Sequence, residues 1–386
     1  NLGVRLFGSF SFMVAHVGRI AIVLYLPAVA LAAVSNINIY AAIIIIGILC
    51  VIYTVMGGIE AVVWTDAIQA VVLLGGAILC FILVVVRLDG GFDELFSIAH
   101  ADSKLLQNLT FDWNIKDGTT AGIIIFLAFG FNSLNQYTSG QDVVQRYVTT
   151  KDIGGARKSL WTTMWMSVCF SIVFFLLGTA LYAFYKTQPE LLNPAMAKSD
   201  GILPFFIMQQ LPVGVAGLII AAVFAASQSS ISSSLNSIAT AWTKDVDSRL
   251  LRPKATDKDY LNAAKWVVVV VGILGIGGAA LVALANIENA FKAFMSIIGL
   301  ASGSLGGLFA LGIFTKRGNG KGAMVGAVVG IAAVAIIKFG GFPVTGILNG
   351  FIGFTSCLVV GYLVSLATGG GTEQGEELSV HGKSQT

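Results

Sequence analysis

The sequence predicts an all-α protein that crosses a membrane many times. Of the 386 residues, 56% are hydrophobic and 11% are charged, whereas soluble domains have about 25% charged residues. The mean hydropathy is +0.85, and the apolar residues gather in segments of about 20 residues, enough for a helix to cross the ~30 Å hydrocarbon core. A net charge of only +3, without a basic stripe, excludes a nucleic-acid-binding protein. The sequence contains no nucleophile–base pair, metal cluster or phosphate loop that would indicate an enzyme.

The lengths of the apolar segments predict ten transmembrane helices. They cover residues 4–34, 38–56, 59–86, 119–140, 160–185, 213–243, 261–287, 290–314, 322–339 and 345–368. We expect residues 1–368 to form one transmembrane domain. The Gly- and Glu-rich residues 369–386 predict a disordered tail. The chain begins at Asn1 without an initiator Met or signal peptide, and we expect an N-terminal part to be missing.

The lysines and arginines between these segments predict the orientation of the chain. With the N-terminus inside the cell, 15 of them lie on the inner side and 7 on the outer side. Membrane proteins keep such an excess in their cytoplasmic loops. We therefore expect both ends of the chain to be cytoplasmic, and the acidic loop 87–118 to be external.

The first predicted helix carries Arg19 about 15 residues from its inner end, past the middle of the membrane. A guanidinium stays charged, and its position at the centre of a membrane helix costs about 2.5–3.5 kcal/mol on insertion scales. Asp66 is the only carboxylate that the predicted segments place deep in the membrane, about 12 Å nearer the inner side by helical rise. We therefore predict that Arg19 binds an anionic substrate. Pairing with an internal carboxylate is the alternative.

The third predicted helix follows Gly57-Gly58 and carries Asp66 two turns from its start, roughly 10 Å deep by helical rise. Carboxylates at membrane depth are rare and are usually functional. The alternative is an interfacial Asp that accepts a local hydrogen bond.

The fourth predicted helix is apolar for about ten residues and then becomes rich in amides next to Gly130. Asn132, Asn135 and Gln136 suit a polar or sugar-like ligand, because interrupted membrane helices often line binding sites. Alternatively, these residues are the inner end of a helix that emerges into water. We expect the latter for residues from Gln141 onward.

The sixth predicted helix contains seven serines, one glutamine and one asparagine within residues 227–237. Ser229, Ser232 and Ser233 share one helical face. Small residues also allow close helix packing, and serines often bond to their own helix, but this density exceeds what packing needs. The serine face and Asp66 lie at comparable heights. Together they offer the carboxylate and hydroxyl oxygens that a hard cation such as Na+ prefers.

Three motifs, in this order, resemble those of the sodium:solute symporter family. They are residues 53–69, residues 141–146, and the serine run that ends at Ser237. The resemblance extends from residue 1 to about 368, although Ile59 stands where the family usually has Leu, Met or Phe. Within the family, residues 3–12, 16–19 and 228–236 look most similar to the sodium/sialic acid symporters.

The resemblance implies the inverted-repeat fold of the leucine transporter, with Arg19 as the partner of the substrate carboxylate. It implies a sodium site common to the family, lined by the Ala226 carbonyl, Ser229 and Ser230. It implies a second sodium site, found in part of the family, formed by Asp66, Ser232 and Ser233, with Ser229 shared. It also implies that this chain lacks the first two core helices, so that the activity belongs to the longer parent protein.

These observations predict sodium-coupled uptake of a carboxylated sugar, sialic acid, by alternating access. The predicted substrate contacts are Arg19, Asn132 and Gln136, and Na+ is the predicted coupling ion. The alternatives are a symporter for another monocarboxylate, such as proline or pantothenate, and a membrane sensor built on a transporter fold. We expect a monomer in the lipid bilayer of the bacterial inner membrane, with no nucleic-acid partner.

Overall fold

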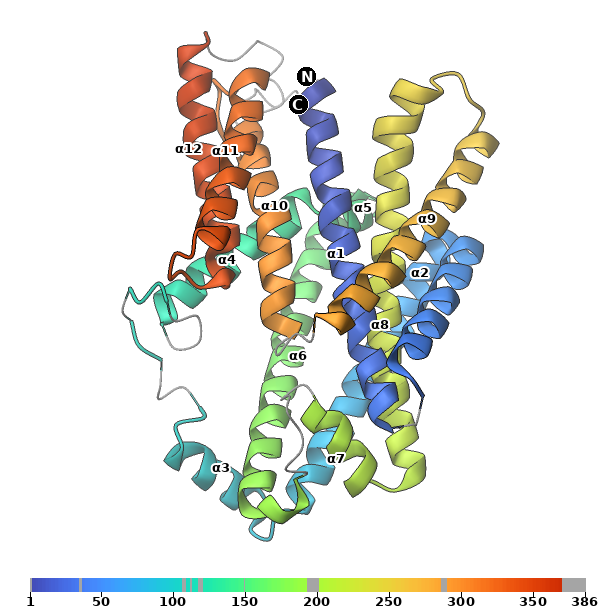
Figure 1. The fold of residues 1–386 in the computed structure, drawn as a ribbon, viewed down its shortest axis with the longest axis vertical. Helices are drawn as coiled ribbons and strands as arrows, with labels where there is room; N and C mark the ends of the chain where they lie inside the picture. The colour runs from blue at the N-terminus through green and yellow to red at the C-terminus, as the bar shows by residue number, and fades with distance from the viewer. Residues whose placement is uncertain are drawn as a thin grey trace.

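The computed structural model describes residues 2–34, 37–105, 109–111, 113–116, 121–148, 150–192, 201–285 and 290–369, and nearly all of them are helical. Most helices run along the long axis of the molecule (Figure 1). In chain order they are α1 (Leu2–Val34), α2 (Ile39–Val86), α3 (Gly91–Ala101), α4 (Gly122–Ser139), α5 (Gln141–Val148), α6 (Ile153–Thr187), η1 (Pro189–Leu191), α7 (Ile202–Gln210), α8 (Val213–Ala241), η3 (Trp242–Leu251), α9 (Asp257–Leu284), α10 (Ala290–Phe314), α11 (Gly320–Phe339), η4 (Gly346–Leu348) and α12 (Asn349–Ala367).

The fold class predicted from the sequence is confirmed. Eight stretches of the described residues are long and apolar enough to cross a membrane, and the protein is a multi-pass membrane protein. Each predicted transmembrane segment coincides with helical structure. The sequence analysis did not predict the short helices α3, α5, η1 and α7. The predicted disordered tail is residues 369–386. Of these, only Gly369 belongs to the described residues.

Helix α2 extends from Ile39 to Val86 and contains two predicted transmembrane segments. The Tyr53 hydroxyl nevertheless hydrogen-bonds to the Thr65 hydroxyl, twelve residues further on. In a straight helix these residues would lie about 18 Å apart along the axis, beyond the reach of both side chains. The chain therefore bends sharply between them, as the predicted turn near Gly57-Gly58 requires.

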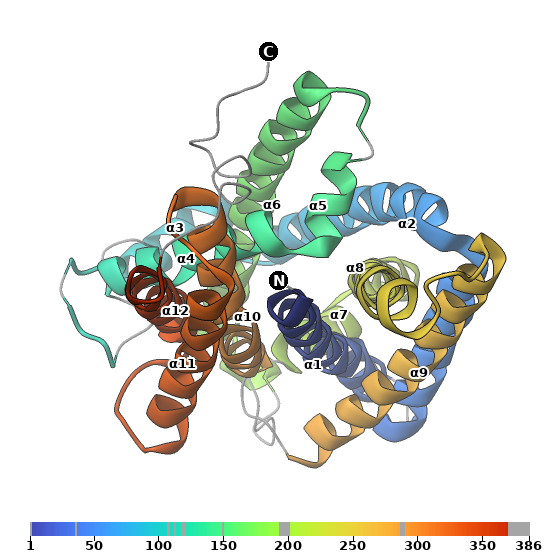
Figure 2. The same ribbon diagram turned by 90° about the horizontal axis from the view of Figure 1, so that it is seen from above.

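Four helices, α1, α2, α8 and α9, share one hydrophobic core, and we call them the α1 body. The core includes the buried side chains of Leu24, Ile43, Leu235 and Val268, one from each helix. Figure 2 shows α1 with α8 and α9 on one side and α10 on the other.

Helices α4, α10, α11 and α12 form a second group, which we call the α10 body. Its hydrophobic clusters join Ala128 of α4 to Met295 of α10, and Leu308 of α10 to Ala327 of α11 and Cys357 of α12. The ring of Phe131 meets that of Phe354 edge-on at 4.9 Å, which attaches α4 to α12.

Glycines bring α11 and α12 into close contact. Gly322, Gly326 and Gly330 recur every four residues on one face of α11 and are buried. A Cβ atom on Gly326 would overlap the carbonyl oxygen of Cys357 and lie 2.8 Å from Cα of Gly361. Small residues at this spacing let membrane helices approach to backbone contact.

At one end of the bundle, α3 and α7 pack against α6 and the end of α2. The buried side chains of Val84, Leu95, Phe184 and Phe206 belong to this cluster. Asp102, at the end of α3, accepts hydrogen bonds from Lys186 and from the Tyr182 hydroxyl, the latter at 2.9 Å. The start of α1 and the end of α12 lie at the opposite end (Figure 1).

Candidate functional site

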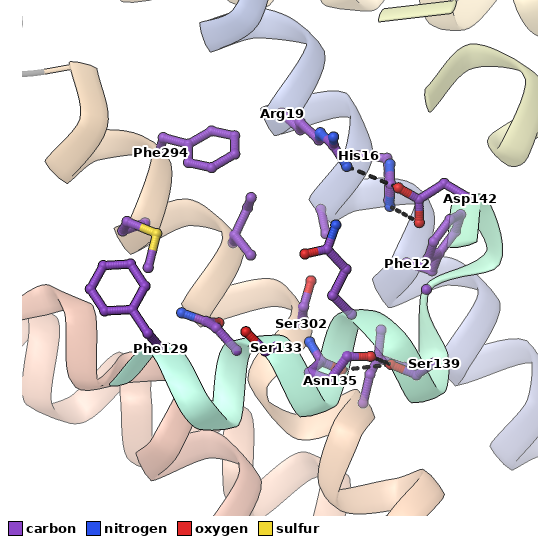
Figure 3. A pocket seen from close by; sticks show the side chains of 17 residues that line it. Phe12, His16, Arg19, Phe129, Ser133, Asn135, Ser139, Asp142, Phe294 and Ser302 are labelled. Carbon is purple, nitrogen blue, oxygen red and sulfur yellow. Dashed lines mark hydrogen bonds and ion pairs between the residues drawn. The ribbon is translucent and has the colours of Figure 1, made fainter. Parts of the chain in front are cut away.

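A cavity of about 210 Å³ lies where α1, α4 and α10 meet, between the α1 body and the α10 body. Its lining combines aromatic rings with amide, hydroxyl and charged groups, as Figure 3 shows. The polar lining residues are His16, Arg19, Asn132, Ser133, Asn135, Gln136, Ser139, Asp142 and Ser302.

Arg19 extends from α1 into this cavity, where its side chain is 22% exposed. Its Nη1 donates a hydrogen bond to Oδ2 of Asp142 at 3.0 Å. Its Nε is buried and has no hydrogen-bond partner among the described residues. The expectation that no internal carboxylate lies near Arg19 was therefore wrong, although the guanidinium keeps an unused donor.

Asp142 reaches Arg19 because the chain changes direction at Gly140, between α4 and α5. A Cβ at Gly140 would lie 2.5 Å from the carbonyl oxygen of Gln136 and 2.9 Å from Oδ1 of Asp142, so only glycine fits this junction. Asp142 is 7% exposed. The expectation that the chain emerges into water from Gln141 onward was wrong for this residue, since α5 continues along the protein.

His16 is a further polar group of the cavity that the sequence analysis did not single out. Its Nδ1 lies 3.2 Å from the Ser234 hydroxyl, and its Nε2 lies 3.9 Å from Oδ1 of Asp142. The ring packs on Phe12, with 4.1 Å between ring centroids. The spacing of His16 and Arg19 was a usable signal, because residues three apart share one helical face.

The predicted amide residues of α4 line the cavity opposite Arg19. Asn132 and Gln136 both line it, and within the part of the chain that the structure describes the buried Asn132 Nδ2 has no hydrogen-bond partner. Asn135 is engaged within its own helix, since its Oδ1 accepts a hydrogen bond from Ser139 at 2.6 Å. A buried donor left unpaired costs about 1–3 kcal/mol. The Asn132 amide and Arg19 Nε are therefore suited to a ligand with several acceptor oxygens.

Asp66 lies beside the serine face of α8, as predicted from their heights in the membrane. Ser229 donates to Oδ1 of Asp66 at 2.5 Å, and Ser233 donates to Oδ2 at 3.1 Å. Ser232 is fully buried, and its hydroxyl donates to the Ser229 carbonyl oxygen at 3.1 Å. The structure thus brings together three of the four residues predicted for the second sodium site.

Arg146 of α5 also joins this cluster, whereas the sequence indicated it only as the last residue of the family-like motif 141–146. Its Nη2 donates to Oδ2 of Asp66 at 2.6 Å and to the Ser233 hydroxyl at 2.9 Å. A positively charged group therefore sits where the carboxylate and the hydroxyl converge. Oxygens that hold one cation in this way have the chemistry to hold Na+.

The other two predicted sodium ligands, Ala226 and Ser230, lie on α8 close to Ser229. The Ser230 carbonyl oxygen accepts a hydrogen bond from Ser234 at 2.8 Å. Among the described residues, the hydrogen-bonded cluster around Asp66 does not include Ala226 or Ser230.

A bundle of transmembrane helices with a cavity that polar side chains line, and with a separate carboxylate–hydroxyl cluster, has the organisation of a secondary transporter. The model of the sodium:solute symporter family matches residues 3–330. The chain therefore belongs to the sodium:solute symporter family, whose members are sodium-coupled transporters and not enzymes. The predicted family and coupling ion are confirmed.

Individual relatives extend this similarity over almost the whole chain. The sodium/sialic acid symporter NanT of Aliivibrio fischeri is 44% identical over 95% of this chain and 71% of its own length. The sodium/sialic acid symporter SiaT of Proteus mirabilis is 41% identical over 94% of this chain and 72% of its own length. A solved substrate-bound, outward-open structure of a Na+-coupled sialic acid symporter superposes with a TM-score of 0.87, at 39% identity, over 95% of this chain and 75% of that chain.

Proposed function

We propose that this protein takes up sialic acid, a sugar that carries a carboxylate, together with Na+. The observation that carries the proposal is the chemistry of the cavity. It places a guanidinium with an unused buried Nε opposite a buried amide with an unused Nδ2. A carboxylate would accept from Arg19, and the hydroxyl and amide groups of the sugar would pair with Asn132 and Gln136.

The cavity's position supports transport by alternating access. Arg19 belongs to the α1 body, whereas Asn132 and Gln136 belong to the α10 body. A substrate that contacts both sets of residues favours one arrangement of the two bodies, and movement of one body against the other would open the cavity to either side. Each positive charge that enters with the substrate contributes about 2.3 kcal/mol per 100 mV of membrane potential.

Two groups of residues would hold sodium. Asp66, Ser229, Ser232 and Ser233 would form the site that Arg146 contacts in this structure. The Ala226 carbonyl, Ser229 and Ser230 would contribute to the site common to the family. The hydrogen bonds around Asp66 support the first group, and family membership supports the second.

The protein would act as a monomer in the lipid of the bacterial inner membrane, with both ends cytoplasmic. The bacterial relatives support this location. The excess of lysine and arginine on one side supports the orientation. Large apolar side chains such as Phe175 and Ile273, 79% and 63% exposed, would face lipid.

Uptake by proteoliposomes that contain the full-length protein tests this function. Radiolabelled sialic acid should accumulate when an inward Na+ gradient is imposed, and an equal K+ gradient should not support accumulation. Unlabelled sialic acid should compete, whereas proline and pantothenate should not. Equal uptake in the two gradients would reject sodium coupling, and stronger competition by proline or pantothenate would assign the cavity to that monocarboxylate.

A further inference from the structure

The short helix α5 touches both candidate sites at once. Asp142 and Arg146 lie four residues apart, so they share one face of the helix. Asp142 pairs with Arg19 of α1 in the cavity, and Arg146 pairs with Asp66 of α2 in the cation cluster.

Charges at this spacing could pair with each other, because an acidic and a basic residue at i and i+4 are neighbours on a helix surface. In this structure each pairs across to a different helix instead. The placement also suits the helix itself. Asp142 is in the first turn, at the positive end of the helix dipole, and Arg146 is in the last turn, at the negative end.

Asp142 and Arg146 each carry a charge of the same sign as the ligand proposed for the site that they contact. Asp142 offers Arg19 a carboxylate, the group by which an anionic substrate would bind. Arg146 offers a positive charge to Asp66 and Ser233, two of the oxygen donors proposed for sodium. The substrate carboxylate must therefore compete with Asp142, and sodium must compete with Arg146.

The exchange is sterically reasonable on both sides. The Arg146 side chain is 43% exposed and that of Asp66 12%, so Arg146 has room to move away from the carboxylate. In the cavity, Asp142 uses only Oδ2 for Arg19. Its buried Oδ1 lies 3.9 Å from Nε2 of His16 and accepts no hydrogen bond from the residues that the structure describes. Gly140 separates α5 from α4, so α5 can move without bending the helix that carries the cavity's amides.

We propose that α5 is an ion-pair bridge that couples the two ligands: sodium displaces Arg146 from Asp66, and the movement of α5 withdraws Asp142 from Arg19, which then accepts the substrate carboxylate. This proposal rests on the proposed function and adds the residues that link its two sites. Both pairs belong to one eight-residue helix, so release of one pair weakens the other. By linkage, the substrate must increase sodium affinity by the same factor by which sodium increases substrate affinity.

The test measures binding, by titration calorimetry of purified full-length protein with sialic acid at low and high Na+. Sodium should raise the wild-type affinity by a factor within the roughly 5- to 150-fold range of such couplings. In Asp142→Asn, affinity at low Na+ should rise about five-fold, because Arg19 no longer has a competing carboxylate. In Arg146→Gln, affinity for Na+ should rise, as measured by the Na+-dependent increase in melting temperature without substrate.

In both variants the sodium-dependent gain in substrate affinity should fall by about three-fold or more, and the double variant should show no further fall, because either substitution alone breaks the bridge. Arg157→Gln, an exposed arginine at the start of α6, is the matched control and should behave as wild type. A sodium-dependent gain that stays within two-fold of wild type in both variants would overturn the bridge. If the wild-type protein itself binds sialic acid equally well in Na+ and K+, the proposed function fails as well, which separates the two proposals.

Discussion

Arg19 and Asp142 form an ion pair inside the cavity, with 3.0 Å between Nη1 and Oδ2. The charge of Arg19 is thus partly balanced without any ligand. A substrate carboxylate would exchange one partner for another, and this lowers its net contribution to binding. What such a substrate would add is a partner for the buried Nε.

Esterification of the substrate carboxylate should identify its partner. Wild-type protein should bind the methyl ester of sialic acid about 100-fold more weakly than the acid, since loss of a buried charge-paired hydrogen bond costs about 2–5 kcal/mol. In Arg19→Gln the acid and the ester should bind with similar affinities, as measured by competition against labelled substrate. Persistence of the wild-type preference for the acid in Arg19→Gln would assign the carboxylate to another residue.

Removal of one hydroxyl from the cation cluster should weaken sodium binding. Ser233→Ala removes an oxygen that lies 3.1 Å from Asp66, and we expect the half-saturating Na+ concentration for uptake to rise about ten-fold, or about 1.4 kcal/mol. Ser237→Ala is the control, because its buried hydroxyl, one turn further along α8, has no hydrogen-bond partner. If the two variants shift the sodium dependence equally, the cluster around Asp66 does not bind the ion.

The contact between α11 and α12 should depend on the absence of a side chain at Gly326. Gly326→Ala places a methyl group against backbone atoms of α12, and overpacking of this kind costs about 1–3 kcal/mol. Gly312→Ala should be neutral or stabilising, because a Cβ there meets no atom within 4 Å and alanine favours the helix. Melting temperatures in detergent measure both effects, and equal temperatures for the two variants would contradict the close approach.

The attachment of α3 to α6 should weaken only at acidic pH. Hydrogen bonds from Lys186 and Tyr182 lower the pKa of Asp102 from its ordinary value of 3.8. A carboxyl group whose pKa is lowered in the folded protein stabilises the folded state when the pH is above the pKa that the group has in the unfolded chain. This contribution is lost as the pH falls through the lowered pKa of the folded protein. The protection factors of the α3 amides, which correct hydrogen exchange for its intrinsic pH dependence, should therefore be constant from pH 8 to 5 and fall only below about pH 4.

Asp102→Asn should give α3 fast exchange already at pH 7. Asp89→Asn, at an exposed position before α3, should not. A change in the wild-type protection factors between pH 5 and 7 would show that another group controls the attachment.

The sequence predicted the membrane helices and the pairing of Asp66 with the serine face, because both depend on local periodicity and on depth in the membrane. Segment lengths placed the transmembrane helices, and helical rise placed Asp66 level with Ser229 and Ser233. These quantities follow from the spacing of residues along single helices.

The partners of Arg19 and Asp66 could not be predicted in the same way. Asp142 and Arg146 follow a break at Gly140, and the direction of a chain after a break is set by tertiary packing. The sequence alone therefore places Asp142 at a helix end that emerges into water, and Arg146 only at the end of the motif 141–146. A short segment with an acid at its start and a base four residues later was the available signal, since that pattern favours a helix.

The boundary between the α1 body and the α10 body has a consequence for how the protein evolves. Neither group of helices alone determines the shape of the cavity, because each supplies only part of the lining. A substitution at a contact between the two that lies away from the cavity, such as that of Phe7 of α1 with the cluster that contains Leu311 of α10, can alter which ligands fit without replacing any residue that lines the cavity. Substrate preference can therefore diverge among relatives whose binding residues are identical.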